Sequence, residues 1–143
     1  MGAHLGIGAI ARTPFARGTV LSEYVGEVIP YDPCSTPPPD NRYTFDIMGN
    51  SAEPLACIDA LHVGSWTRFI NHSCKPNAEY VLKRVGREAR VCVEVIREIG
   101  VGGEIKVGYG SAYWKTMEEL GMWCGCGEKG CRFGEKKGRG KER

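Results

Sequence analysis

Short hydrophobic runs separated by glycines and prolines dominate the chain, and this pattern predicts strands. The runs are rich in Val, Ile, Tyr and Phe, and 20 glycines and 8 prolines interrupt them. The predicted strands cover residues 20–29 (with a break at Gly26), 42–49, 56–61, 78–96 and 104–110. Residues 78–96 are predicted to form a hairpin around Val85-Gly86-Arg87. Because side chains alternate along a strand, Val91, Val93 and Val95 are expected to share one buried face.

One helix is predicted near the C-terminus, over residues 112–120. Ser111 is suited to the N-cap and Gly121 to the stop after the last turn. Tyr113, Met117 and Leu120 recur at helical spacing. Strands do not alternate with helices elsewhere, so the fold class is mainly β with short helices.

Two segments are not expected to form regular structure. Residues 30–41 contain five prolines, which exclude a helix or a central strand and predict a loop of polyproline character. Residues 135–143 form a charged tail that is expected to be disordered. Its basic stretch, KKGRGKER, is typical of a solvated tail and only faintly resembles a nuclear signal.

The composition fits one domain without a nucleic-acid or membrane surface. The chain has 143 residues, of which 42% are hydrophobic and 25% charged, and its net charge of +2 is too small to indicate nucleic-acid binding. No apolar run approaches the roughly 20 residues of a membrane helix. Arg12 and Pro14 interrupt the first apolar residues, so no signal peptide is predicted. Seven cysteines without a secretory signal indicate reduced thiols and a metal.

Three of these cysteines, Cys124, Cys126 and Cys131, form a C-x-C-x4-C pattern. A structural zinc takes four ligands in a tetrahedron, so a fourth thiol is needed. Cys74 is the best candidate, because it ends the stretch RFINHSC and precedes the turn signal Lys75-Pro76-Asn77. We expect such a zinc to order a glycine-rich segment with little core of its own, and to have no open position for chemistry. A tail with reduced cysteines and no metal is the alternative.

The remaining cysteines have simpler interpretations. Cys57 and Cys92 fall within predicted strands, where a buried thiol packs as a small apolar residue. Cys34 lies in the proline-rich loop.

Several motifs occur in an order that resembles the SET-domain family of protein lysine methyltransferases. They are LGIGAIA (5–11), RGTVLSEYVGEVI (17–29), YTFDI (43–47), IDA (58–60), RFINHSCKPNA (68–78), GEIKVGYG (103–110) and the late C-x-C-x4-C pattern. The resemblance covers residues 5–133 and implies a β-clip fold of small sheets around a pseudoknot. It also implies a SET domain over 1–121, a post-SET zinc segment over 122–134, and a zinc ion held by Cys74, Cys124, Cys126 and Cys131.

The same resemblance implies an activity and a set of site residues. It implies S-adenosylmethionine as methyl donor and a lysine of a protein, most often a histone tail, as acceptor, and hence a nuclear location, or otherwise a cytoplasmic one. Tyr109 and Tyr24 are the implied catalytic residues, and Tyr24, Tyr43 and Val107 line the implied substrate channel. The implied cofactor-binding residues are Gly6, Ile7, Gly8, Tyr43, Arg68, Phe69, Asn71, His72 and Phe133.

Simpler interpretations of the same residues stay open. Tyrosines in a β-rich domain often only pack, and Asn71-His72 could form a turn whose polar side chains satisfy the backbone. GIGAIA also resembles a dinucleotide fingerprint, but only five residues precede Gly6 and Pro14 interrupts the helix that should follow.

Three departures from the family pattern bear on function. The stretch between Ile29 and Tyr43 is short, Gly108 stands where an acidic residue is usual, and Val107 stands where Phe or Tyr is usual. A smaller residue at 107 leaves room for di- or trimethylation. The first two departures keep a non-catalytic SET-like module that binds a peptide or partner as the alternative function. A zinc-stapled β domain with no enzymatic role is a third possibility.

Overall fold

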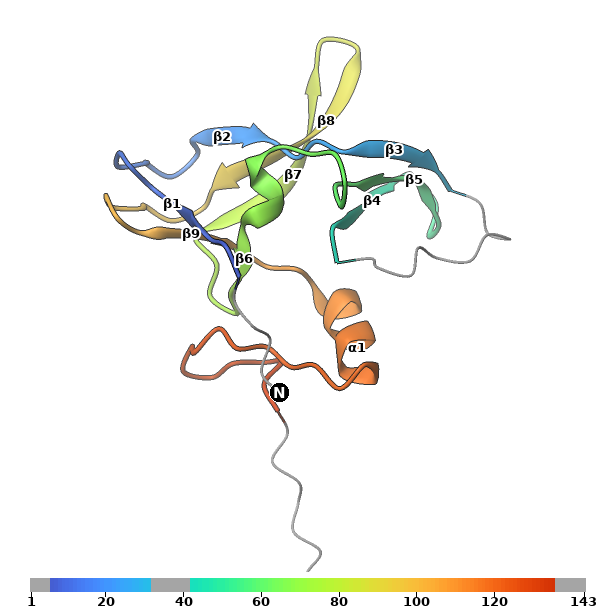
Figure 1. Cartoon of the computed structure of the whole chain (residues 1–143). Coiled ribbons are helices and arrows are strands. Elements are labelled where there is room, and N and C mark those ends of the chain that lie inside the picture. Colours follow the sequence, from blue (N-terminus) through green and yellow to red (C-terminus); the bar gives the residue numbers. More distant parts are fainter. Residues whose placement is uncertain (1–5, 32–41, 136–143) are drawn as a thin grey trace, which may run out of the picture.

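The computed structural model describes residues 6–31 and 42–135, and the regular elements in them are mostly strands (Figure 1). The elements in chain order are β1 (Ala9–Ile10), β2 (Val20–Glu23), β3 (Glu27–Pro30), β4 (Thr44–Met48), β5 (Pro54–Asp59), the 3-10 helix η1 (Trp66–Phe69), β6 (Asn71–His72), β7 (Ala78–Val85), β8 (Glu88–Val95), β9 (Glu104–Val107) and α1 (Ser111–Glu119). None of the helices in this part of the chain is long and apolar enough to cross a membrane.

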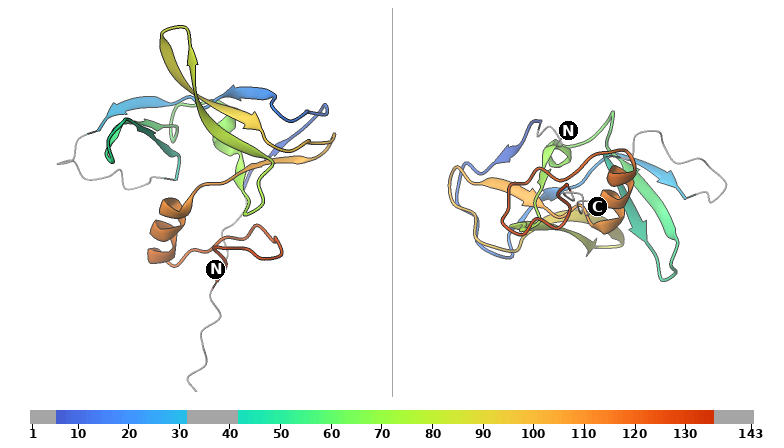
Figure 2. Two further views of the ribbon diagram at one scale, coloured as in Figure 1. Left: turned by 180° about the vertical axis from the view of Figure 1, so that it is seen from behind. Right: turned by 90° about the horizontal axis from the view of Figure 1, so that it is seen from below.

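The strands form three small sheets, as the β-clip prediction requires. Their orders are β2-β8-β7, β3-β5-β4 and β1-β9-β6. The first two are antiparallel, whereas β6 pairs with β9 in parallel. Helix α1 and the C-terminal loop lie together on one side of the sheets, and Figure 2 shows that loop crossing beneath them.

The predicted hairpin of β7 and β8 supplies the centre of the core. Gly86 takes a positive φ of 63° at its turn, and Val91, Val93 and Val95 are all buried, as their alternation predicted. Val93 and Val95 pack with Ile70, Ile99 and Ile105, so one cluster joins β8 to the segments before β6 and within β9. Cys92 is buried on β8 and Cys57 lies on β5, as expected of cysteines within strands.

The predicted strand at 20–29 is divided into β2 and β3 around Gly26. A Cβ at this position would stand 2.4 Å from the carbonyl oxygen of Asp59, so only glycine allows the backbones to approach this closely. Tyr24, within the break, is buried against Ile58 and Ala60. The break therefore lets one stretch of chain contribute to two sheets.

One detail predicted for the helix is wrong. Gly110, with φ 86°, occupies the N-cap, and Ser111 is the first helical residue, so the backbone turn takes the place of a side-chain cap. The buried side chains are Trp114 and Met117, whereas Leu120 is 64% exposed. Trp114 packs between the rings of His72 and Phe133, so contacts with distant segments select the buried face of the helix. Gly121 has φ 72° and ends the helix as predicted.

Three predictions fall outside the described residues. These are the proline-rich loop from residue 32 onward, Cys34 within it, and the charged tail from residue 136 onward.

Truncating the core at Ile99 tests this packing. Ile99 is 2% exposed, so Ile99→Ala should lower the free energy of unfolding by about 2–4 kcal/mol through lost burial and a residual cavity. Val101→Ala is the matched control, because Val101 is 69% exposed and its truncation should change stability by less than ~0.5 kcal/mol. Urea unfolding midpoints measure both. Equal losses in the two variants would contradict the assignment of this core.

Candidate active site

Two segments far apart in sequence lie side by side at the centre of the site. β6 and β9 pair Asn71 with Lys106 and His72 with Val107. Beyond β6, the amide of Ser73 donates to the carbonyl of Val107 at 3.0 Å, and the side-chain oxygen of Asn77 accepts from the amide of Lys106 at 2.8 Å. These bonds continue the pairing past the strand ends and fix the chain that leads into Tyr109.

Tyr109 is held at both ends. Its amide donates to Nδ1 of His72 at 3.0 Å, and its hydroxyl donates to the carbonyl oxygen of Ile70 at 2.6 Å. Burial, with a smaller contribution from Tyr113, raises the pKa of the Tyr109 hydroxyl far above its ordinary value. The hydroxyl therefore stays protonated, and its oxygen keeps lone pairs with which to accept a hydrogen bond.

His72 connects Tyr109 to the cysteines. Because Nδ1 accepts from a backbone amide, the proton of the neutral ring resides on Nε2, which lies 3.5 Å from Sγ of Cys74. Burial lowers the pKa of His72 to about 4, and the Arg132 guanidinium adds to this effect. The ring is 6% exposed and lies among the rings of Tyr109, Trp114 and Phe133. His72 is thus a neutral side chain that accepts a hydrogen bond from Tyr109 and contacts Cys74.

Tyr24 approaches from the other sheets. Its hydroxyl donates to the carbonyl oxygen of Tyr43 at 2.6 Å, and its ring packs edge-on against Tyr80 at 5.3 Å. Burial, followed by the Asp59 carboxylate, raises the pKa of Tyr24 to about 12. Like Tyr109, it is a fixed, protonated phenol.

A cavity of about 890 Å³ lies on one side of Tyr109. Most of the residues predicted to bind the cofactor line it, namely Gly6, Ile7, Tyr43, Arg68, Phe69, Asn71 and His72. Two predicted residues do not. Gly8 lies on the wall of a separate apolar cavity of about 520 Å³, and Phe133 stacks on Trp114 at 5.8 Å beside a third cavity of about 240 Å³.

A smaller cavity, of about 390 Å³, also has Tyr109 in its wall. Tyr24, Phe45, Tyr80 and Tyr109 line it, and Asp46 borders it from β4. Four residues border both this cavity and the larger one, namely Arg42, Arg68, Tyr109 and Tyr113. The two spaces therefore adjoin at Tyr109.

Val107 does not occupy the predicted channel position. It is completely buried in the cluster with Ile70 and Val93, and it lines neither cavity. The small side chain of Val107 therefore does not enlarge either cavity, and the degree of methylation stays a prediction. Gly108 does line the smaller cavity, and a Cβ there would meet nothing within 4 Å, so glycine is not required at this position for steric reasons.

Sequence reasoning missed several aromatic residues of the site. Tyr80, Phe45 and Tyr113 line the smaller cavity, and Trp114 lines the larger one. The alternation of side chains along β7 and β4 could have assigned Tyr80 and Phe45 to the inner faces of their strands. Only the meeting of two sheets brings their ring centroids and that of Tyr24 within 6.1 Å of one another.

The four cysteines predicted to hold zinc come together. The Sγ atoms of Cys74, Cys124, Cys126 and Cys131 all lie within 4.8 Å of one another. Tetrahedral thiolates with zinc–sulfur bonds of about 2.3 Å lie about 3.8 Å apart, and Cys74 stands 3.6 Å from Cys131 and 4.0 Å from Cys124. Backbone amides of Cys126 and Arg132 also point at the sulfurs of Cys124 and Cys74. The donor set and its spacing fit a structural zinc.

The sequence profile of the SET domain matches residues 6–110, which is well over half of the chain. The chain belongs to the SET-domain family. The match ends before Cys124, so the boundaries predicted for the SET domain and the post-SET segment stay predictions.

Relatives of the SET domain come from fungi, animals and plants. A "SET domain-containing protein" of Phaeosphaeria nodorum is 34% identical over 128 residues, which cover 88% of this chain and 19% of the relative. The histone-lysine N-methyltransferase EHMT1 of Mus musculus is 32% identical over 132 residues, covering 90% of this chain and 10% of the relative. The histone-lysine N-methyltransferase ASHH3 of Arabidopsis thaliana is 30% identical over 133 residues, which cover 89% of this chain and 34% of the relative. The chain thus spans only a minor part of the length of these relatives.

Removing one thiol tests the cysteine cluster. The protein should bind one equivalent of zinc, and its cobalt form should show the charge-transfer and tetrahedral bands typical of thiolate ligands. Cys131→Ser should weaken binding by about 100-fold or more, measured by competition with a chromophoric chelator. Cys57→Ser, which lies outside the cluster, should change nothing. A cobalt spectrum that Cys131→Ser leaves intact would contradict the site.

Proposed function

We propose that this SET domain transfers a methyl group from S-adenosylmethionine to the side-chain amine of a protein lysine. The observation that carries the proposal is the meeting of two cavities at Tyr109, one large enough for a nucleotide-sized donor and one smaller and lined largely by aromatic rings. The family membership and the names of the methyltransferase relatives support the same reaction class.

In the proposed reaction, the donor occupies the larger cavity, where its sulfonium supplies an electrophilic methyl group. Asn71, His72 and the backbone at Gly6-Ile7 form the walls against which the donor binds. The amine forms a bond to the methyl carbon as the carbon–sulfur bond breaks, which leaves a neutral thioether and a methylated ammonium. The domain contributes mainly by holding amine, methyl and sulfur in line.

The smaller cavity suits the acceptor. Free lysine has a pKa near 10.4, so about one molecule in a few thousand is neutral at pH 7, a deficit of roughly 4–5 kcal/mol. The rings of Tyr24, Phe45 and Tyr80 exclude water and so disfavour the ammonium form. Tyr109 can accept an N–H bond from the neutral amine, because its own proton is directed at Ile70. This contact turns the nitrogen lone pair toward the larger cavity, while the lost proton goes to solvent.

Strand β4 gives the peptide a place to bind. It is an edge strand of the β3-β5-β4 sheet, and its residues Thr44, Phe45 and Asp46 line the smaller cavity. An extended peptide that adds to this edge would place a lysine side chain at the cavity mouth, where Asp46 attracts its charge. We take a histone tail as the substrate class, because these relatives are histone-lysine N-methyltransferases, and the nucleus as the location, because histones reside there.

Tyr109→Phe tests the reaction. Loss of the hydroxyl should lower methyl transfer by about 100-fold while S-adenosylhomocysteine affinity changes less than about threefold, because an oriented contact to the amine is lost and the ring remains. Transfer of labelled methyl to a histone mixture measures the first value, and calorimetry measures the second. Tyr31→Phe, at the exposed end of β3, is the control and should keep full activity.

Wild-type outcomes separate the alternatives. Cofactor binding without any transfer would favour the non-catalytic module, and absence of both would favour a zinc-stapled β domain. Full activity of Tyr109→Phe would contradict the role given to the hydroxyl.

The rate should also depend on pH in one direction. Between pH 7 and 9, kcat/KM should rise close to tenfold per pH unit, because the neutral fraction of the substrate lysine rises in that proportion. No falling limb is expected in this range, because the pKa of Tyr24 is about 12 and that of Tyr109 is also raised. A profile that falls before pH 9, in protein that circular dichroism shows to be folded, would argue that an ionising tyrosine takes part.

A further inference from the structure

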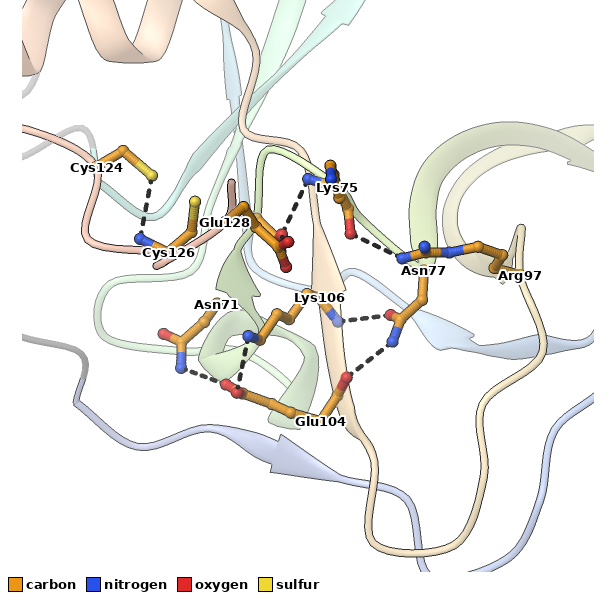
Figure 3. Close-up of polar contacts among 10 residues, drawn as sticks. Asn71, Lys75, Asn77, Arg97, Glu104, Lys106, Cys124, Cys126 and Glu128 are labelled. Carbon is orange, nitrogen blue, oxygen red and sulfur yellow. Dashed lines mark hydrogen bonds and ion pairs between the residues drawn. The ribbon is translucent and has the colours of Figure 1, made fainter. Parts of the chain in front are cut away.

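Glu104, the first residue of β9, lies at the centre of a polar network beside the larger cavity (Figure 3). Its Oε1 accepts from Nδ2 of Asn71 at 2.9 Å, and its Oε2 lies 3.4 Å from Nζ of Lys106. Its backbone carbonyl accepts from Nδ2 of Asn77 at 2.9 Å. Glu104 itself lines neither of the two cavities that meet at Tyr109.

The contact with Glu104 decides which way the Asn71 amide faces. A side-chain amide offers a donor on one side and an acceptor on the other, whereas an ionised carboxylate only accepts. Glu104 therefore holds the NH₂ group of Asn71, and the Asn71 oxygen points away from Glu104 (Figure 3). Because Asn71 lines the larger cavity, the atom left for a ligand there is an acceptor.

Gly8 provides the room for this pair. A Cβ at position 8 would stand 2.8 Å from Oε1 of Glu104 and 3.1 Å from Nδ2 of Asn71. Any larger residue would therefore press on both partners of the hydrogen bond. This contact gives a reason for glycine at position 8, which does not itself line the larger cavity.

We infer that Glu104 is a positioning residue that makes Asn71 selective for a ligand bearing a protonated amino group. The inference rests on the proposed function, in which the donor carries such a group on its amino-acid end. With Glu104 in place, the fixed carbonyl of Asn71 accepts from the ammonium. Without it, the amide can turn and present its NH₂ group, which cannot accept that bond.

Two probes that share the same nucleoside test the selectivity. S-adenosylhomocysteine carries the amino-acid end, and 5′-methylthioadenosine lacks it. Glu104→Gln keeps the size of the side chain but can donate as well as accept, so it no longer fixes the Asn71 amide. Calorimetry should give an affinity for S-adenosylhomocysteine lowered about tenfold and an affinity for 5′-methylthioadenosine within twofold of wild type. The ratio of the two affinities should therefore fall about tenfold.

A matched control and a second variant accompany this measurement. Glu94→Gln removes the carboxylate of another half-buried Lys–Glu pair, Lys83–Glu94, which lines neither cavity, and it should leave both affinities unchanged. Gly8→Ala keeps Glu104 but presses on its carboxylate, and should reduce the same ratio. In the double variant with Glu104→Gln, Gly8→Ala should reduce the ratio little further, because the contact that it disturbs is already lost.

The outcomes separate this inference from the proposed function. Equal weakening of both probes in Glu104→Gln would mean a purely structural role and would overturn the inference, as would an unchanged ratio. In either case, binding of S-adenosylhomocysteine by the wild-type protein would leave the proposed function standing. Failure of the wild-type protein to bind S-adenosylhomocysteine would overturn both.

Discussion

The parallel pairing of β6 with β9 is the contact on which the rest of the site depends. Only two residue pairs form it, yet the hydrogen bonds of Ser73 with Val107 and of Asn77 with Lys106 extend the pairing beyond the end of β6. Parallel neighbours cannot be joined by a tight turn, and here the whole β7–β8 hairpin lies between the two segments. The valines of that hairpin form the core on which both segments rest. The packed core thus supports the β6–β9 pair, and this pair positions Tyr109.

The β6–β9 pair also connects the cysteine cluster to the cavities. The segment that supplies Asn71 and His72 to the larger cavity supplies Cys74 to the cluster two residues later. In the other direction, Met122, Cys124 and Cys126 form part of the cavity wall. A metal bound by the four thiols would therefore fix one wall of the proposed donor site as well as the loop. His72, with one ring nitrogen toward Tyr109 and the other toward Cys74, links the two centres directly.

Sequence patterns predicted the features that depend on residues close together in the chain. Alternating valines identified the buried face of β8, Gly121 identified the helix end, and a turn signal singled out Cys74. What escaped prediction depends on contacts between distant segments. The β6–β9 pair has only two residue pairs, too few for a pattern of alternating hydrophobic residues. Trp114 is buried where the C-terminal loop stacks Phe133 on it. Val107 is in the core because its side chain lies on the face of β9 that packs against Ile70 and Val93. The family resemblance, confirmed by the profile match, placed residues at the site that no pattern would have found.

The proposed reaction requires donor and acceptor to meet at Tyr109 from the two adjoining cavities. A crystal structure of the protein with S-adenosylhomocysteine and a lysine peptide tests it most directly. We expect the thioether sulfur in the larger cavity, the lysine nitrogen among Tyr24, Phe45 and Tyr80, and the Tyr109 hydroxyl within hydrogen-bond distance of that nitrogen. Both ligands in the same cavity, or a lysine bound away from the smaller cavity, would contradict it.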